Sequence, residues 1–284
     1  MKISKVIKLP AQQRLLYWIK ERESIRQARK KKLPRPWTDD EILNEFRFCN
    51  VRRMDDKVSK WILKHWYKPN YNHKNALIAC IIARHFNKPS TLEALGFPTT
   101  WQPRKYKRVL ASIAASDVPI FNGAYIITGK NSNSPNKYST VIDETTQQFI
   151  DDPPELNTDS MEDCVNALLP YTHIGTFMAG QIISDLRWAM KGKWKDAKTW
   201  APIGPGSRRG MNRLLGRKVD AGLNQEQFIT ELETMMGDCS ILLDSKISKR
   251  LEAIDYQNCL CEFDKYTRVL LGEGRAKQKY KEAV

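Results

Sequence analysis

The sequence predicts a mainly α-helical protein that folds as two lobes. Apolar residues recur at helical spacing through most of the 284 residues. An acidic and proline-rich stretch, DETTQQFIDDPPELNTDS at 143–160, separates two helical halves. β-Branched runs around turn residues are concentrated at 119–143, which predicts a small β-hairpin or an irregular flap there. With 41% hydrophobic residues, the chain can bury the core of a globular protein.

The charge of the chain points to a polyanionic partner. It has 47 Lys and Arg against 32 Asp and Glu, a formal net charge of +15. Nucleic acid is the usual partner of so basic a chain, and a merely soluble basic surface is the alternative. Without an apolar run of about 18 residues or an apolar signal core, we expect a cytoplasmic protein with no membrane contact. The six cysteines and four histidines are scattered, so we expect no metal site.

Residues 1–36 are expected to form a basic helix or arm. Eight Lys and Arg lie between Lys20 and Arg35, against two acidic residues. Such a block fits a helix laid along a phosphate backbone, and a solvated helix face is the alternative. Lys30 and Lys31 are the candidate DNA contacts in this block.

The first helical lobe is expected over residues 37–150. One helix begins at Thr38, whose hydroxyl can cap it, and runs on into 48–66. There Val58, Trp61, Ile62 and His65 repeat at helical spacing as core positions. Further helices are expected over 72–86, the most apolar segment, and over 91–97 and 106–116.

The second lobe, residues 151–284, is expected to contain a helical hairpin. Ser160 can cap its first helix, Pro170 ends that helix and Gly175 allows a tight turn. The second helix then carries a buried stripe and, on another face, Gln181 and Asp185. The buried stripe consists of Ala179, Ile182, Ile183, Leu186 and Met190. We therefore expect a hairpin with a polar side.

The segment GPGSRRGMNR, residues 204–213, is expected to hold an anion. Its glycines and proline disfavour regular structure at its start, while Ser207 and three arginines supply donors for negative charge. We predict a glycine-rich turn that opens a helix, a common geometry for phosphate binding.

The hairpin resembles the helix-hairpin-helix unit of DNA glycosylases, in the order Leu-Pro, turn, Ile-Gly, Phe-x-Ala. In that unit, backbone amides grip a DNA phosphate, which here implies the amides near His173, Gly175 and Thr176. His173 stands where the usual pattern has its first glycine, and Phe177 where lyase-type members carry lysine. Glycosylases of this type carry a catalytic aspartate just past the second helix, before a segment like RRGMNRLLG. That aspartate is missing here. Asp196 lies some residues earlier and either replaces it or has another role.

Four ordered blocks between about Tyr17 and Arg275 resemble the alpha-glutamyl/putrescinyl thymine pyrophosphorylases, the amino acid:DNA transferases. The blocks are PWTDDEILNEFRFCNVRRMDDKVS, IGTFMAGQIISDL, GPGSRRGMNRL and CEFDKYTRVLLGEGR. The resemblance implies a glycosylase-like helical fold, a phage or phage-derived origin and a place in host cytoplasm. It also implies that the pyrophosphate of 5-(pyrophosphoryloxymethyl)uracil in double-stranded DNA is replaced by a free amino acid or polyamine. Mg²⁺ commonly accompanies pyrophosphate and is a possible cofactor. We expect the protein to be a monomer.

Such a reaction needs a flipped base, a pyrophosphate site and a base for the ammonium. The candidates are Trp101, Trp194 and Trp200 as aromatic walls; Ser207, Arg208, Arg209, Arg52 and Arg53 for pyrophosphate; Arg213 for the DNA backbone; and Asp185, Asp196, Glu262 and Asp264 for the amine. Arg208 and Arg52 are also candidate catalytic residues. The alternatives are core packing for the tryptophans, surface ion pairs of Arg52 and Arg53 with Asp55 and Asp56, and caps or ion pairs for the carboxylates. As whole functions, a DNA glycosylase and a non-catalytic DNA-binding protein stay open.

Overall fold

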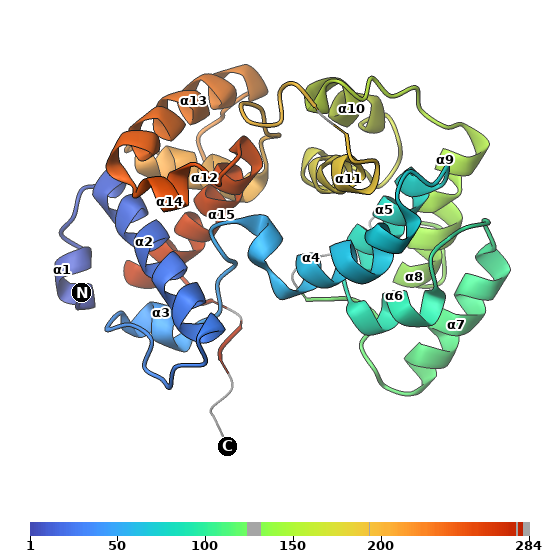
Figure 1. Ribbon diagram of the computed structural model, residues 1–284, viewed down its shortest axis with the longest axis horizontal. Coiled ribbons are helices and arrows are strands. Elements are labelled where there is room, and N and C mark those ends of the chain that lie inside the picture. Colours follow the sequence, from blue (N-terminus) through green and yellow to red (C-terminus); the bar gives the residue numbers. More distant parts are fainter. Residues whose placement is uncertain (124–131, 193, 277, 281–284) are drawn as a thin grey trace. The chain divides into compact units, whose positions relative to one another are not determined.

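The computed structural model describes residues 1–123, 132–192, 194–276 and 278–280, and this part of the chain is helical (Figure 1). Within these ranges there is no β-strand, and a single antiparallel bridge joins Phe46 to Lys279. The predicted mainly α-helical class is confirmed.

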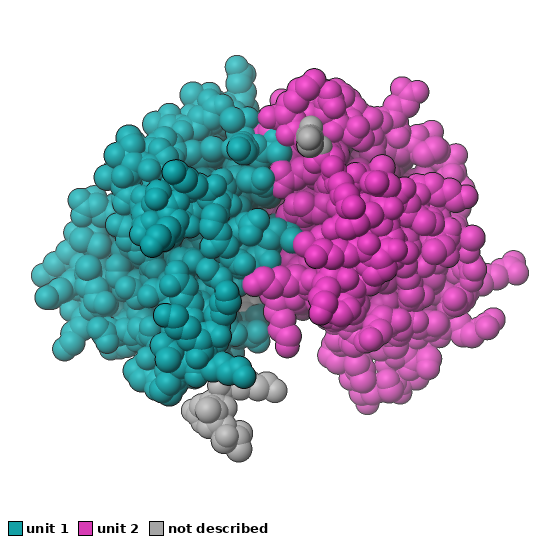
Figure 2. Space-filling view, in the orientation of Figure 1, with its two compact units in different colours: residues 1–56, 197–284 teal, residues 57–196 magenta. Residues whose placement is uncertain are grey.

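The chain folds into two compact units, drawn in different colours in Figure 2. Unit 1 consists of Met1–Asp56 and Ala197–Val284, and unit 2 is the continuous segment Lys57–Asp196. This division differs from the three consecutive segments expected from the sequence. The two ends of the chain share one hydrophobic core. Acidic or proline-rich stretches in the sequence do not indicate such a pairing of distant segments.

Unit 1 is built on the packing of two helices near the carboxyl end, α12 and α15, against the amino-terminal α2. Its helices are α1 (Ile3–Val6), α2 (Ala11–Lys30), α3 (Glu41–Glu45), η1 (Arg53–Asp55), α12 (Pro205–Leu214), α13 (Gln225–Leu242), α14 (Ser245–Ser248) and α15 (Ala253–Leu270). Phe228 of α13 and Tyr266 of α15 are fully buried in its core.

Helix α2 is a core helix and not a free arm. It buries Trp18, Ile19 and Ile25 completely. Arg22, one of the eight basic residues of the block, is also fully buried, and its guanidinium donates to the carbonyl oxygen of Phe48 at 3.1 Å. Lys30 at the end of the helix stays exposed. The basic block therefore divides into structural and solvent-facing members.

Helix α3 begins at Glu41 and not at Thr38, which corrects the expected start. Its cap is Asp40, whose carboxylate accepts from the amide of Leu43 at 2.9 Å. The same buried carboxylate also accepts from the hydroxyl of Tyr266 at 2.6 Å. Because the core fixes Asp40 in this way, the Thr38 hydroxyl instead accepts from the amide of Asp40. The helix ends at Glu45 and does not run on into 48–66.

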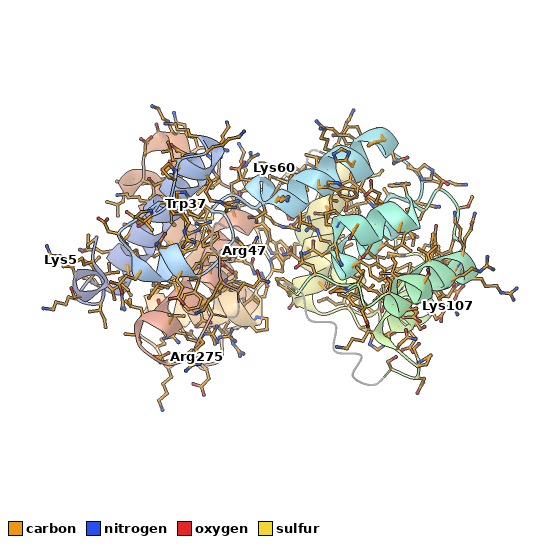
Figure 3. All side chains as sticks on the ribbon, turned by 90° about the horizontal axis from the view of Figure 1, so that it is seen from below. Lys5, Trp37, Arg47, Lys60, Lys107 and Arg275 are labelled. Carbon is orange, nitrogen blue, oxygen red and sulfur yellow. The ribbon has the colours of Figure 1, made fainter. Side chains whose placement is uncertain are left out.

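Unit 2 surrounds α5, the most apolar helix, as expected. Its helices are α4 (Lys57–Trp61), η2 (Ile62–Tyr67), η3 (Lys68–Asn70), α5 (Ala76–Phe86), α6 (Pro89–Leu95), α7 (Pro103–Ala115), α8 (Lys137–Ser139), η4 (Thr140–Thr146), α9 (Gln148–Asp151), α10 (Met161–Leu168) and α11 (Thr176–Ala189). Helix α5 is buried on every side from Ile78 to Phe86 and packs against α11. Lys107 of α7, labelled in Figure 3, donates to Asp143 of η4 at 2.8 Å.

The stripe predicted from Val58 to His65 is only partly correct. Ile62 is buried, whereas His65 is exposed and stacks on Trp61 with ring centroids 5.4 Å apart. The segment Ile62–Tyr67 is a π-helix. Because a π-turn contains more residues than an α-turn, the buried face moves on to Trp66 and Tyr67.

Of the two alternatives expected at 119–143, the β-hairpin is not found in the described residues, and the irregular flap stays a prediction. Residues 124–131 lie outside the described part of the chain. The second β-branched stretch instead forms α8 and the start of η4, capped by Asn136, whose side chain accepts from the amide of Ser139 at 2.9 Å. Val141 and Ile142 pack into the core of unit 2 as helical residues.

Candidate nucleic-acid and anion site

The predicted helical hairpin is formed by α10 and α11 in unit 2. Ser160 caps α10 and accepts from the amide of Asp163 at 3.1 Å, as expected. The left-handed residue of the turn is His173, with φ of 66°, and not Gly175. His173 therefore adopts the backbone conformation that favours glycine at the position where the glycosylase pattern has one.

Gly175 is the N-cap of α11 and leaves the helix start open. A Cβ atom at Gly175 would meet nothing within 4 Å, so no packing contact requires a glycine there. The first turn of α11 has no acidic residue and no side-chain cap. The amide of Thr176 thus lies at a helix start that suits an anion, in agreement with the expected phosphate contact, which stays a prediction.

The imidazole of His173 is held by an acid from a helix outside the hairpin. Its Nε2 lies 2.8 Å from Glu144 of η4. Hydrogen bonds from Ser134, Ser132 and His173 lower the pKa of Glu144 to about 2, although desolvation raises it. The side chain of His173 is therefore directed to Glu144, and its contribution to a phosphate site would come from the backbone.

The polar side expected for the hairpin is buried. Asp185 is fully buried, and its carboxylate accepts from Arg84 at 2.6 and 2.7 Å and from the Tyr67 hydroxyl at 2.6 Å. Gln181 is 5% exposed. A carboxylate enclosed in this way has no path to an incoming ammonium ion. These contacts tie Asp185 to the packing of α11 on α5 and agree with the ion-pair alternative, and its catalytic role stays a prediction.

Asp196 is a second helix cap for α10. Its carboxylate accepts from the amides of Met161 at 2.8 Å and Glu162 at 3.0 Å. The hydroxyl of Ser160 also donates to it at 3.2 Å. These contacts satisfy the free amides at the start of α10, so the alternative reading of Asp196 as a cap fits better than a catalytic one.

The segment 204–213 is helical almost throughout, which corrects the expected turn. Helix α12 begins at Pro205 directly after Gly204. Ser207 is fully buried, and its hydroxyl accepts from the amide of Gly204 at 2.9 Å. This hydroxyl is therefore used inside the helix cap, and Ser207 cannot contact pyrophosphate from this position.

The glycines of α12 allow close packing on α15. A Cβ atom at Gly210 would lie 2.1 Å from the carbonyl oxygen of Leu260, and one at Gly206 would lie 2.9 Å from the sulfur of Cys261. The glycines that suggested a phosphate loop thus permit two helices to approach each other.

Arginines gather around one buried carboxylate between α12 and α15. Asp264, 1% exposed, accepts from Nε of Arg209 at 2.9 Å and Nε of Arg213 at 2.8 Å. Nε of Arg268 lies 3.9 Å away, within ion-pair range. We call Arg209, Arg213 and Arg268 the arginine cluster. Its carboxylate is buried and ion-paired, so Asp264 holds guanidinium groups in place, which agrees with the ion-pair alternative to its predicted role as a base.

The members of the arginine cluster differ in exposure. Arg213 is 7% exposed and also donates to Glu273 at 2.5 Å. Burial lowers the pKa of Arg213, but hydrogen bonds to Glu273 and Asp264 outweigh this and raise it. Arg209 and Arg268 are 35% and 39% exposed. Their Nε atoms face Asp264, which leaves the terminal amino groups of these two guanidinium groups to bind an external anion.

Arg208 points to a different side of α12 from Arg209, because consecutive helical residues are about 100° apart. It is partly buried, its Nε has no hydrogen-bond partner, and no acid pairs with it in the ranges that the structure describes. Arg208 is thus a second candidate for an anion, separate from the arginine cluster.

Of the remaining candidates, Glu262 and Arg53 make contacts within the protein, and Arg52 is partly exposed. Glu262 accepts from the amide of Cys49 at 2.9 Å and from Lys265 at 3.1 Å. Arg53 is 5% exposed, and its amide donates to Asp255 at 2.7 Å, whereas Arg52 is partly exposed. Asp55 pairs with Arg26 and Arg250.

The tryptophan candidates are mostly core residues. Trp194 and Trp200 are 5% and 6% exposed, so neither is free to stack on a flipped base. Trp101 is half-buried and donates to Gln147 at 2.6 Å. Lys30 and Lys31 are exposed, as a DNA contact requires.

In the described ranges, no three His, Cys, Asp or Glu side chains are grouped so that they could hold a metal ion. None of the helices described for this chain has the length and apolar character needed to cross a membrane.

The sequence reasoning missed Arg268 as a partner of the candidate site. The signal was present, because Asp264 and Arg268 are four residues apart and lie on one helix face. That Arg209 and Arg213 meet the same carboxylate depends on the packing of α12 on α15.

Comparison with known proteins gives a family for this chain. Over 203 residues it is 29% identical to a protein named 5-hmdU DNA kinase from Bacillus phage SP10. This match covers 62% of the chain and 32% of the relative, so the chain matches about a third of the relative's length. No solved structure matches. The family described as "5-hmdU DNA kinase, helical domain" matches residues 10–276, and the chain belongs to this family.

Proposed function

We propose that this chain is a DNA-modifying enzyme of thymine hypermodification, as found in phages. In this proposal it replaces the pyrophosphate of 5-(pyrophosphoryloxymethyl)uracil in double-stranded DNA with an amino acid or amine. The family description supports the target, because 5-hmdU is the nucleoside of 5-hydroxymethyluracil. The net charge of +15 and the open start of α11 at Thr176 support binding to a DNA backbone.

The arginine cluster carries the proposal. Nε of Arg209 donates to Asp264 at 2.9 Å, and Nε of Arg268 lies 3.9 Å from the same carboxylate. Both arginine side chains stay partly exposed, at 35% and 39%. Fixed donors aimed at a departing anion stabilise charge that develops in the transition state. Two guanidinium groups suit a pyrophosphate, which presents several oxygens to planar donors.

In the proposed reaction, the incoming ammonium first loses a proton to solvent, and the nitrogen lone pair of the resulting amine forms a bond to the methylene carbon of the base. The bond from that carbon to the pyrophosphate oxygen breaks, and its electron pair leaves with pyrophosphate. The ammonium formed loses one proton. All four carboxylates considered for this step, Asp185, Asp196, Glu262 and Asp264, already accept hydrogen bonds within the protein. We therefore assign the final proton to solvent or to the departing pyrophosphate.

The second candidate function is that of a DNA-binding module for a 5-hmdU kinase. It is favoured by the family description and by the relative's greater length. In this sequence no Gly-Lys pair is followed by Ser or Thr, as the phosphate-binding loop of P-loop nucleotide enzymes requires. In that case the arginine cluster would hold DNA phosphates, and the nucleotide site would lie outside these 284 residues.

The deciding experiment uses the full chain and two DNA substrates. DNA with pyrophosphorylated 5-hydroxymethyluracil is incubated with a mixture of amino acids and polyamines, with and without Mg²⁺, and its nucleosides are analysed by mass spectrometry. Amine-linked thymidine and released pyrophosphate are expected. Unchanged pyrophosphorylated nucleoside would refute the transfer, and abasic sites would indicate a glycosylase. Phosphorylation of 5-hydroxymethyluracil DNA with ATP would instead identify a kinase.

A further inference from the structure

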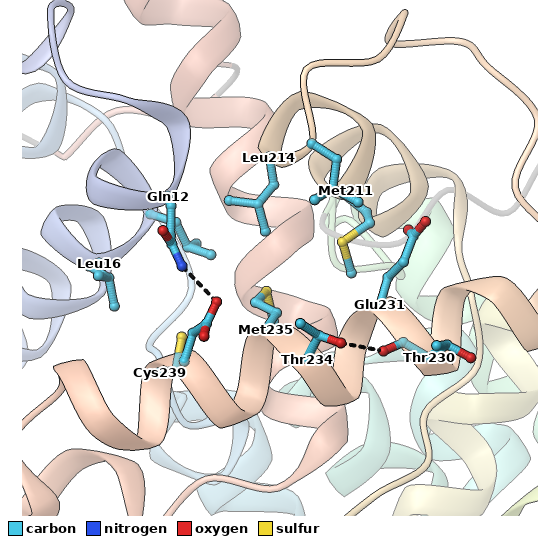
Figure 4. A pocket seen from close by; sticks show the side chains of 12 residues that line it. Gln12, Leu16, Met211, Leu214, Thr230, Glu231, Thr234, Met235 and Cys239 are labelled. Atoms are coloured by element: carbon cyan, nitrogen blue, oxygen red, sulfur yellow. Dashed lines mark hydrogen bonds between the residues drawn. The ribbon is translucent and has the colours of Figure 1, made fainter.

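Unit 1 contains an apolar pocket of about 300 Å³ to which no role has been assigned so far (Figure 4). Three helices form its walls: Leu15 and Leu16 come from α2, Met211 and Leu214 from α12, and Met235 and Cys239 from α13. This volume lies in the range of small-molecule sites, and the two methionine side chains can adapt to a flexible ligand.

The pocket is separate from the arginine cluster. Met211 and Leu214 lie on the side of α12 that faces α2 and α13, whereas Arg209 and Arg213 face Asp264 of α15. A ligand in the pocket would therefore not reach the anion held by the cluster.

One wall of the pocket, helix α13, is acidic although the chain is basic. Helix α13 has four acidic residues, Glu226, Glu231, Glu233 and Asp238, and no Lys or Arg, in a chain with a net charge of +15. DNA is repelled by such a face, and a cation is attracted to it. Burial, and next the nearby Asp238, raise the pKa of Cys239 to about 12, so this thiol adds no charge.

The two carboxylates that line the pocket are in different states. Glu231 is neutralised by Arg217, which donates to it at 2.6 and 2.7 Å. Asp238 accepts from the neutral amide of Gln12 at 2.7 Å, the bond drawn in Figure 4. No cation pairs with Asp238 in the part of the chain described. The apolar pocket therefore has one uncompensated negative charge at its edge.

We propose that this pocket binds an aliphatic chain that ends in an ammonium group. The chain would lie among the leucines and methionines, and the ammonium would pair with Asp238. Amines of this class are protonated at neutral pH, with a pKa of about 10 as for lysine. A carboxylate on the same chain would be repelled. A polyamine, one of the amines considered for the proposed function, belongs to this ligand class, so the site would name the amine side of that reaction. Binding here needs neither DNA nor pyrophosphate and can therefore fail or succeed separately from the proposed function.

The test uses three probes with the same eight-carbon chain: n-octylamine, 1-octanol and octanoate. Binding to the full chain without DNA is measured by isothermal titration calorimetry, and the rise in melting temperature is measured in parallel. We expect octylamine to bind about tenfold more tightly than octanol, from one charge-assisted hydrogen bond. Octanoate is expected to bind most weakly.

Two variants identify the site. Asp238→Asn keeps an acceptor for Gln12 and should reduce octylamine binding to the level of octanol. Leu215→Lys, at a rim position that is 51% exposed, should weaken octylamine and favour octanoate without disturbing the core. Glu233→Gln is the matched control, because it removes one exposed charge of α13 outside the pocket and should change nothing.

Three results would overturn the proposal. Equal affinity for octylamine and octanoate would show that charge is not recognised. Unchanged octylamine binding in both Asp238→Asn and Leu215→Lys would place the ligand elsewhere. Failure of all three probes to bind would show that the pocket is a packing defect.

Discussion

A Cβ atom at Gly210 would lie 2.1 Å from the carbonyl oxygen of Leu260. The backbones of α12 and α15 therefore touch at this point, and the arginine cluster is built on that contact. The spacing of the two helices decides whether Arg209 and Arg213 can both reach Asp264.

Replacement of Gly210 by alanine should destabilise unit 1. The methyl group must push α12 away from α15, and overpacking of this kind costs roughly 2 kcal/mol or more. Urea unfolding of Gly210→Ala measures this cost. Gly237→Ala is the control, because Gly237 lies in α13 with nothing within 4 Å of its Cβ position. That change should stabilise the protein by about 0.5–1 kcal/mol, and equal effects of the two would contradict the close contact.

Asp185→Asn should reduce stability. The change removes a charge that compensates the buried guanidinium of Arg84, and breaking such a pair costs about 3–5 kcal/mol. Tyr67→Phe removes one hydrogen bond and should cost about 1–2 kcal/mol. Thermal and urea unfolding measure both. Asp143→Asn, in an exposed pair with Lys107, should cost less than about 1 kcal/mol. A stable Asp185→Asn protein that had lost only activity would identify Asp185 as a catalytic residue.

Stability should respond in opposite directions to acid at His85 and Asp255. Burial lowers the pKa of His85 from 6.5 to about 4, so the unfolded state binds the proton first and stability falls as pH drops below 6.5. Burial raises the pKa of Asp255 from 3.8 to about 6, although amide hydrogen bonds from Arg53 and Glu252 lower it. The folded state then binds the proton first, and this group adds stability as pH drops below 6.

The two variants His85→Gln and Asp255→Asn separate these contributions. As the pH falls from 7 to 5, His85 should lower the free energy of unfolding by roughly 2 kcal/mol, and Asp255 should raise it by about 1 kcal/mol. Urea unfolding at both pH values should therefore show a smaller acid loss in His85→Gln and a larger one in Asp255→Asn. Parallel pH profiles of the two variants and the parent protein would contradict both shifts.

Arg209→Ala should lower turnover more than stability. If Arg209 holds the departing pyrophosphate, its loss should reduce turnover about 10²-fold, as for one preorganised donor. Arg209→Lys should restore activity only in part, because an ammonium lacks the planar pair of donors. Arg213→Ala should instead destabilise the fold by roughly 2–3 kcal/mol, since Arg213 is buried between Asp264 and Glu273.

Arg208→Ala distinguishes the two anion positions on α12. If Arg208 contacts a DNA phosphate, the variant should bind DNA more weakly and keep its turnover at saturating DNA. Measurements of DNA affinity and of pyrophosphate release give the two values. Loss of turnover in Arg208→Ala with full activity in Arg209→Ala would move the leaving-group site to Arg208.

DNA binding should fall steeply with salt, because lysines and arginines displace counterions from phosphates. Lys30→Glu with Lys31→Glu should weaken binding to all sequences alike and flatten the salt dependence. Lys246→Glu with Lys249→Glu changes the net charge equally at another exposed site in unit 1 and is the control. An affinity that stays constant between about 50 and 200 mM salt would contradict binding through the DNA backbone.

Local chemistry in the sequence determined the helical class and several element boundaries. The apolar run that became α5, the cap at Ser160 and the pair of helices α10 and α11 depend on neighbours within a few residues. The predicted helix start at Thr38 was wrong. Asp40 caps the helix instead, because the hydroxyl of Tyr266, more than two hundred residues away in the chain, fixes its carboxylate.

Tertiary structure decided the candidate site. Spacing placed Asp185 and Asp264 on helix faces, but only packing showed that Arg84 encloses the first and that Arg209 and Arg213 surround the second. The glycines of 204–213 look the same in sequence whether they admit a phosphate or a neighbouring helix. Which of the two they admit depends on how closely α12 approaches Leu260 of α15. The distance between these two helices is set by tertiary packing and cannot be read from either segment alone.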